Sequence, residues 1–138
     1  MDRLTARFIN AALVYFVLGM ASGVTLIFWP GWLGEMRTVH VHINLLGWLA
    51  MTIYAAGYSL VPRLCGRPLH SRRMAEAQFW LSNGALIGLS VFLFIAALQA
   101  PGTLAYAFYY ALRAASAVLM LLSALLFVYN LSVTMRER

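Results

Sequence analysis

The sequence contains few charged residues, and none of them is lysine. Charged residues make up 10% of the 138 positions, whereas hydrophobic residues make up 63%. A soluble domain is closer to a quarter charged, so this composition excludes an ordinary soluble protein. It predicts an integral membrane protein with roughly four or five spans of about 20 residues each and no separate soluble domain. The first apolar run is too long for a signal peptide, and we expect it to be a mature helix.

Several chemical signatures are also absent. Cys65 is the only cysteine, which excludes an intrachain disulfide bond. The sequence has no Cys-x-x-Cys-His motif for covalent haem attachment, no zinc-ligand spacing, no phosphate-binding loop and no Ser/His/Asp set. No chain of carboxylates crosses the apolar segments, which argues against a self-contained proton pump.

The apolar residues form four long segments separated by short polar or Pro/Gly-containing breaks. We expect helices over about 8–29, 38–61, 75–98 and 104–131. Pro62 is expected to end the second helix, because proline cannot donate the next backbone hydrogen bond. The predicted fold is therefore all-α: one transmembrane domain over residues 1–138, built as a four-helix bundle.

The arginines are distributed unevenly over the ends of these segments. With four spans, one side of the membrane holds eight of them: Arg3, Arg7, Arg63, Arg67, Arg72, Arg73, Arg136 and Arg138. The other side holds only Arg37. Positive residues accumulate on the cytoplasmic side, so we expect both termini in the cytoplasm of a bacterium, with the chain in its inner membrane. This pattern explains the basic balance without nucleic-acid binding.

Two histidines open the second apolar segment, in the run Arg37-Thr38-Val39-His40-Val41-His42-Ile43-Asn44. On a helix, residues i and i+2 point about 200° apart, so His40 and His42 serve two sites or two neighbouring subunits rather than one ion. Imidazole is a natural axial ligand of haem iron, and Asn44 or a backbone carbonyl would orient the second ring nitrogen. The alternative is that both are hydrated interfacial residues.

Arg113 is the second unusual residue, because it lies well inside the fourth apolar segment. A charge at that depth is costly and usually marks a functional site. No carboxylate is available nearby, so we expect Arg113 to meet a ligand anion such as a haem propionate, with Arg37 as a second candidate. The alternatives for Arg113 are snorkelling to the membrane surface or hydrogen bonding to helix carbonyls, and the alternative for Arg37 is a position among the headgroups.

Three motifs in order resemble a known family. They are His40-Val41-His42 through Gly47-Trp48, then Tyr58 through Pro62-Arg63-Leu64-Cys65-Gly66-Arg67, then Gln78-Phe79-Trp80-Leu81 with Gly84. This run, from about residue 38 to 88, resembles the catalytic subunit I of haem–copper oxidases, especially the C-family oxidases and nitric oxide reductases. In that family the His-x-His helix binds two haems, the first histidine a high-spin haem and the second a low-spin haem.

The resemblance also implies an assembly. Subunit I of the family has about twelve helices in three four-helix arcs, whereas this sequence matches one arc without the helices that hold the active-site copper. The resemblance suggests a homo-oligomer, with a trimer favoured and a dimer as the alternative. A haem between neighbours would take His40 from one chain and His42 from the next, which gives a low-spin b-type haem.

We therefore expect a membrane b-type cytochrome that binds haem b through His40 and His42, with Arg37, Asn44 and Arg113 as further cofactor-binding residues. Its role would be electron transfer with an unidentified redox partner, or haem storage. No complete oxygen-reducing site is present, so the chain would be at most an electron-transfer or reductase component. The alternatives are a copper-handling or nitric oxide-related accessory protein, with the two histidines as metal ligands, and a non-redox structural subunit.

Overall fold

The computed structural model describes residues 2–136, without the side chains of Trp32, Leu33 and Glu35. Its elements, none of them a strand, are α1 (Arg3–Phe28), η1 (Pro30–Trp32), α2 (Leu33–His42), η2 (Ile43–Leu49), α3 (Ala50–Cys65), α4 (Arg72–Ala97) and α5 (Leu104–Arg136). Because α2, η2 and α3 form one continuous helix, the described residues contain four helices long and apolar enough to cross a membrane. The predicted all-α fold with four spans is confirmed.

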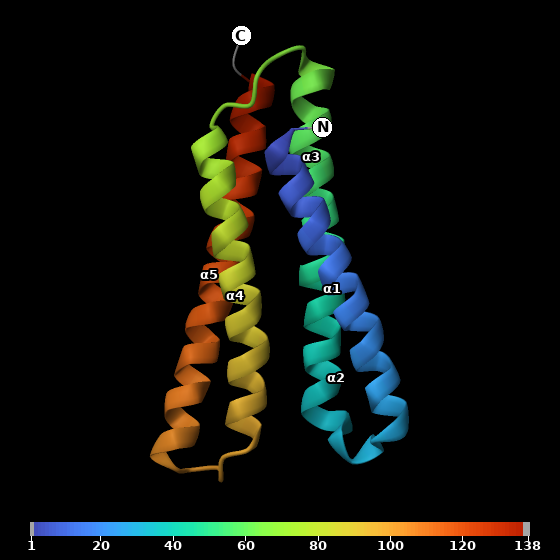
Figure 1. Ribbon diagram of the computed structural model, residues 1–138. Helices are drawn as coiled ribbons and strands as arrows, with labels where there is room; N and C mark the ends of the chain where they lie inside the picture. The colour runs from blue at the N-terminus through green and yellow to red at the C-terminus, as the bar shows by residue number, and fades with distance from the viewer. Residues whose placement is uncertain (1, 137–138) are drawn as a thin grey trace.

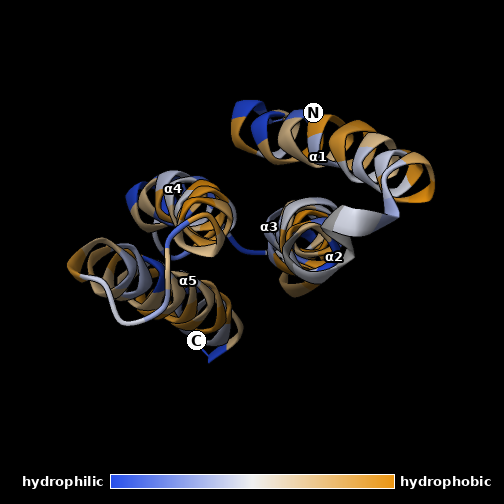
Figure 2. Cartoon of the chain, turned by 90° about the horizontal axis from the view of Figure 1, so that it is seen from below, coloured by the Kyte–Doolittle hydropathy of each residue, from blue (hydrophilic) through white to orange (hydrophobic). Residues whose placement is uncertain are grey.

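The four helices form two antiparallel pairs (Figure 1). One pair is α1 with the α2–α3 helix, and the other is α4 with α5, joined to the first by residues 66–71. Both termini and this connection lie at the same end of the bundle (Figure 1). Apolar residues make up most of all four helices (Figure 2), and many large ones on each helix are exposed, as expected for helices that face lipid.

An aromatic core joins all four helices at the end that carries the termini. Phe8 of α1 is completely buried, and its ring centroid lies 5.0 Å from Phe79 of α4 and 5.6 Å from Tyr58 of α3. Phe127 of α5 packs 4.7 Å from Tyr54 and 5.2 Å from Tyr58. We call this region, defined by these five aromatic residues, the closed end.

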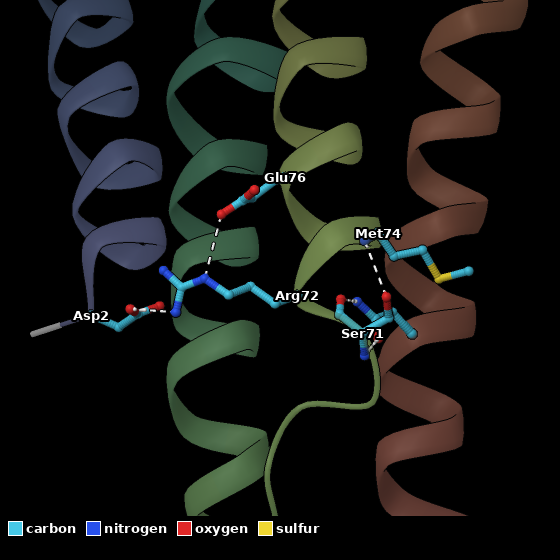
Figure 3. Close-up of polar contacts among 6 residues, drawn as sticks. Asp2, Ser71, Arg72, Met74 and Glu76 are labelled. Atoms are coloured by element: carbon cyan, nitrogen blue, oxygen red, sulfur yellow. Dashed lines mark hydrogen bonds and ion pairs between the residues drawn. The ribbon is translucent and has the colours of Figure 1, made fainter.

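Hydrogen bonds reinforce the closed end where the connection enters α4. The Ser71 backbone N–H donates to Asn130 Oδ1 at 3.0 Å, and Asn130 Nδ2 donates back to the Ser71 carbonyl at 2.8 Å. The Ser71 hydroxyl accepts from the Met74 N–H at 3.2 Å (Figure 3), which caps the first turn of α4. The completely buried amide of Asn130 thus fixes the connection to α5.

An ion-pair network lies on the surface next to this cap. Arg72 bonds to Asp2 at 3.0 Å and to Glu76 at 3.4 Å (Figure 3). All three side chains are about half exposed, since Arg72 is 54% exposed, Asp2 48% and Glu76 42%. The network ties the start of α1 to the start of α4, although exposed pairs of this kind contribute little stability.

The prediction that the second helix ends at Pro62 is wrong. The helix continues through Pro62 to Cys65 and ends at Gly66, whose φ of 64° is left-handed. The Gly66 N–H bonds to the Arg63 carbonyl, and the Arg67 N–H bonds to the Pro62 carbonyl at 2.9 Å, which is the Schellman arrangement. Proline removes one donor but keeps its own carbonyl, which here accepts the bond that closes the helix.

The other helices extend beyond their apolar segments. α1 begins at Arg3 rather than residue 8, α4 begins at Arg72 rather than residue 75, and α5 continues to Arg136 rather than ending at residue 131. Hydropathy marks only the part of a helix that contacts hydrocarbon, whereas the backbone hydrogen bonds continue into the polar turns. The termini and the 66–71 connection bring seven of the eight clustered arginines to one end of the bundle (Figure 1); Arg138 lies outside the described residues.

Candidate functional site

His40 lies in the contact between α2 and α1, where its ring is fixed by polar atoms of α1. Its Nδ1 is 2.9 Å from the Gly19 carbonyl oxygen and 3.0 Å from the Ser22 hydroxyl oxygen. The Ser22 hydroxyl donates its own proton to the Gly19 carbonyl at 2.8 Å. The Gly19 carbonyl oxygen, the nearest of these atoms, can only accept a hydrogen bond, which assigns the imidazole proton to Nδ1 and leaves a lone pair on Nε2. This is the orientation that a metal-ligating histidine requires.

Two glycines of α1 make this contact possible. A Cβ atom at Gly19 would lie 2.6 Å from the side-chain amide of Asn44, and a Cβ atom at Gly23 would lie 3.0 Å from Cε1 of His40. Any larger residue at Gly19 would displace the polar side chains of the second helix. Small residues four apart let helices approach closely in membranes, and here the space they leave is filled by His40 and Asn44.

Asn44 supports the position of His40 from the same helix. Its Nδ2 donates to the His40 carbonyl at 2.9 Å and lies 3.3 Å from His40 Nδ1. The structure therefore brings His40 and Asn44 together. The acceptor for the His40 Nδ1 proton, however, is the Gly19 carbonyl of α1 rather than an atom of the second helix.

His42 faces different neighbours from His40. Its Nδ1 is buried and has no hydrogen-bond partner among the described residues. Arg113 of α5 lies close enough for its positive charge to act on the His42 ring. The two histidines thus lie on different sides of α2, as the angle of about 200° between positions i and i+2 predicts. An unpaired buried ring nitrogen is costly unless a ligand satisfies it.

Arg113 is half-buried on α5, and Arg37 is exposed on α2. The guanidinium of Arg113 lies 5.6 Å from the centroid of the Tyr110 ring, a favourable cation–π distance. Neither arginine forms an ion pair with a carboxylate among the described residues, so both charges are available to an anionic group. The charge of Arg113 acts on His42, and Arg37 forms no hydrogen bond with either histidine in the described part of the chain.

The helix changes its winding directly after His42. Residues Ile43–Leu49 form a π-helix, and Asn44 lies within it. Gly47, in the middle of this segment, is buried, and a Cβ atom there would lie 2.6 Å from Tyr15 and 3.0 Å from Leu86. Single π-helical turns often occur at functional sites. We call the region defined by Gly19, Ser22, His40, His42 and Arg113 the histidine end.

Because the two histidines lie on different sides of α2, each can offer one nitrogen to a separate group. Among the described residues, no three His, Cys, Asp or Glu side chains come together to hold a metal ion. A bare metal ion held by one chain does not fit this donor set. A haem would fit this donor set: single imidazoles such as His40 and His42 would hold its iron, and the unpaired arginines would meet its propionates.

The spacing of Gly19 and Gly23 predicted a close helix contact, but the roles of Gly19, Ser22 and Gly23 beside His40 were not recognised from the sequence. Their signal is the run Gly19-Met20-Ala21-Ser22-Gly23, which indicates close helix contact but does not show which helix approaches. The π-helix has no recognisable signal in the residue pattern, because hydropathy does not report the winding of the backbone.

Comparisons with known proteins show which sequences this chain is similar to. The family model for cytochrome c and quinol oxidase polypeptide I matches residues 3–138. A cytochrome c oxidase subunit 1 homolog of Agrobacterium tumefaciens (strain T37) is 31% identical over 114 residues, which cover 69% of this chain and 21% of that protein. The cbb3-type cytochrome c oxidase subunit CcoN1 of Stutzerimonas stutzeri is 36% identical over 85 residues, which cover 54% of this chain and 18% of that protein.

A third relative is similar over a comparable length. The cytochrome c oxidase subunit 1 of Rhodobacter capsulatus is 31% identical over 118 residues, which cover 72% of this chain and 22% of that protein. The chain thus spans about a fifth of the length of these curated relatives.

Proposed function

Because the chain belongs to the cytochrome c and quinol oxidase polypeptide I family, we propose that it is a b-type cytochrome of the bacterial inner membrane. In this proposal His40 and His42 are axial ligands of haem b, and the protein transfers electrons. The observation that carries the proposal is the hydrogen bond from His40 Nδ1 to the Gly19 carbonyl at 2.9 Å. It fixes the ring within the membrane with Nε2 free, which is how a haem ligand is held.

The surroundings of His42 support a second ligand. Its buried Nδ1 has no partner among the described residues, and the positive charge of Arg113 lies nearby. Arg113, with Arg37 further out on α2, would neutralise the propionates, and Asn44 would keep His40 in place. When bound, the haem supplies a one-electron couple, while this chain's residues hold the iron ligands and exclude water.

The directions of the two histidines favour an assembly. Since His40 and His42 lie on different sides of α2, one chain does not place both on the same haem. Each haem would therefore take its second ligand from another helix, either of a copy of this chain or of another polypeptide. A homotrimer would restore a ring of three four-helix arcs, and a homodimer is the alternative. The arginine-rich end would face the cytoplasm.

Copper handling is less well supported than haem binding. A copper ion held within one chain needs several converging ligands, and the described residues bring together no group of three suitable side chains. Nothing in the structure favours a purely structural role, because a polar site of this kind is costly inside a membrane.

Absorbance of the purified protein tests the proposal. The wild type is expressed with haem supplementation, and spectra are recorded before and after reduction, beside His40→Ala, His42→Ala and the control His70→Ala. His70 lies in the connection at the opposite end of the bundle. We expect a Soret band and paired α and β bands in the wild type and the control, and loss of the paired bands in the other two.

Two results would contradict the proposal. One is a wild-type protein without a Soret band after haem supplementation. The other is an unchanged spectrum in both His40→Ala and His42→Ala. Metal analysis of the same samples distinguishes the alternatives, because copper without haem would support metal handling and neither cofactor would support a structural role.

A further inference from the structure

A groove of about 730 Å³ lies between α1 and α4, lined by residues other than those of the histidine end. Arg7, Asn10, Val14 and Leu18 line it from α1, and Trp80 lines it from α4. These five side chains are exposed. The groove is therefore open to the surroundings of the bundle, which for most of its length are lipid.

The lining changes from polar to apolar along the groove. Both helices begin at the closed end, so Arg7 and Asn10 lie nearest that end. Leu18 lies roughly 16 Å further along α1, at 1.5 Å per residue. The apolar part is lined by Val14 and Leu18 of α1 and by Ile87 of α4. This profile matches an amphiphile with one polar end.

The polar atoms deeper in the groove are already paired. The Tyr15 hydroxyl donates to Asn83 Oδ1 at 2.8 Å, and Asn83 Nδ2 donates to the Phe79 carbonyl at 2.7 Å. Because these two side chains are already hydrogen-bonded, they do not need a polar ligand in the middle of the groove. The guanidinium of Arg7, by contrast, has no hydrogen bond or ion pair with any side chain that the structure describes, so the polar end of the groove attracts an anion.

The acidic residues of the chain are poorly placed to supply that anion from a second copy. There are four of them. Asp2 and Glu76 already bind Arg72, Glu35 belongs to α2 at the opposite end of the bundle, and Glu137 lies outside the described residues. The arginine-containing first turns of α1 and α4 precede the apolar parts of these helices, and the polar headgroup region of a bilayer lies next to its hydrocarbon core.

We propose that this groove binds an anionic phospholipid. Its phosphate lies against Arg7, its glycerol region lies beside Asn10, and one acyl chain lies along Val14, Leu18 and Ile87. Juxtamembrane arginines attract anionic lipids, and the groove adds an apolar surface that orders one chain. The site is independent of the proposed haem ligands.

The fluorescence of Trp80 can report lipid binding, because this residue lines the groove and is 66% exposed. A variant that keeps only this tryptophan replaces Trp29, Trp32 and Trp48 by phenylalanine. It is reconstituted into vesicles of phosphatidylcholine that contain a small, equal fraction of brominated phosphatidylglycerol or brominated phosphatidylcholine. We expect at least a twofold stronger quenching of Trp80 by the anionic lipid, which unbrominated phosphatidylglycerol reverses.

Two arginine variants in this background test the role of the charge. Arg7→Gln should abolish the preference for the anionic lipid, and Arg7→Lys should retain most of it. The matched control is Arg3→Gln, an exposed arginine of the same helix that does not line the groove. Equal quenching by both lipids would overturn the proposal, and so would the same loss in Arg3→Gln as in Arg7→Gln. Reversal of the quenching by inorganic phosphate alone would assign the site to free phosphate instead of lipid.

Discussion

The two ends of the bundle differ in how completely their side chains are packed against, or hydrogen-bonded to, other residues of the chain. At the closed end, Phe8 is completely buried among aromatic rings from other helices, and the buried amide of Asn130 forms two bonds to Ser71. At the histidine end, a buried nitrogen of His42 has no partner among the described residues, and Arg113 has no carboxylate partner there. One end is tightly packed and hydrogen-bonded, and the other leaves polar and charged side chains unpaired among the described residues.

This difference separates stability from function along a single bundle. Apolar and aromatic packing needs no partner outside the chain, so the closed end can be optimised for stability. Groups that bind a cofactor must remain unpaired until it arrives, and that lowers the stability of the region that carries them. Variants at the closed end should therefore mainly lower the free energy of unfolding, and variants at the histidine end should mainly change cofactor binding.

The largest effect is expected from Phe8→Ala, because it removes a completely buried ring from the closed end. Loss of a buried phenylalanine costs about 3–5 kcal/mol in the free energy of unfolding. Denaturation of the detergent-solubilised protein measures it. The control Phe28→Ala removes a ring that is 70% exposed at the other end of α1, with an expected change of less than about 0.5 kcal/mol. Equal losses in the two variants would remove the distinction between the ends.

The next effect is expected from Asn130→Ala, which removes the acceptor of the Ser71 N–H and one of the two donors to the Ser71 carbonyl, the other being the Ala75 N–H. Two lost buried bonds should lower the free energy of unfolding by about 2 kcal/mol. Thr25→Val is the control, since its hydroxyl forms only an exposed bond to the Ala21 carbonyl one turn away. A loss as large in the control would show that Asn130 has no special role in the closed end.

A smaller effect on stability is expected from Gly19→Ala at the histidine end. The new Cβ would lie 2.6 Å from Asn44, and overpacking of this kind costs about 1–3 kcal/mol. Better helix propensity offsets about 1 kcal/mol of it, so the net loss should be about 1 kcal/mol. Because the displaced Asn44 holds His40, the haem spectrum should also change.

Gly34→Ala is the matched control for that substitution. It replaces a glycine of α2 at which a Cβ atom would have no heavy atom within 4 Å, so the spectrum should not change, and the free energy of unfolding should rise by at most about 1 kcal/mol through better helix propensity. A spectral change of the same size in both variants would mean that the contact between Gly19 and Asn44 does not position the haem ligand.

The smallest effect is expected from Arg72→Gln at the surface of the closed end. Its ion pairs with Asp2 and Glu76 are about half exposed, so their loss should cost less than about 1 kcal/mol. The difference in the free energy of unfolding between Arg72→Gln and the wild type should decrease further at high salt. Arg73→Gln is the control, because Arg73 is exposed and has no ion pair among the described residues. A cost above that of Asn130→Ala would show that surface charge, rather than the buried core, holds this end together.

The sequence was sufficient for the fold class but not for the details of backbone and packing. Four apolar segments predict four membrane helices because the bilayer requires internal backbone hydrogen bonding. The helix end at Pro62 was wrong, because the last turn accommodates a proline whose carbonyl still accepts the closing bond. The π-helix over Ile43–Leu49 depends on how Gly47 packs against Tyr15 and Leu86, which a single helix does not reveal.

The candidate site was predictable only as a set of unusual residues. His40, His42 and Arg113 are conspicuous because polar groups are costly in an apolar segment. The partner of His40, the Gly19 carbonyl, belongs to another helix and is a backbone atom, so no side-chain pattern points to it. The roles of Arg37, Asn44 and Arg113 toward a haem, and the oligomeric state, stay predictions.

Thermal unfolding with and without added haem tests most directly whether the histidine end binds a cofactor while the closed end holds the fold. A ligand at 100 times its Kd stabilises the folded protein by about 2.7 kcal/mol. We predict that haem raises the Tm of the wild type and of His70→Ala. The double variant His40→Ala/His42→Ala should unfold near the wild-type Tm without haem and show no increase with it. An equal increase in the double variant, or none in the wild type, would contradict the account.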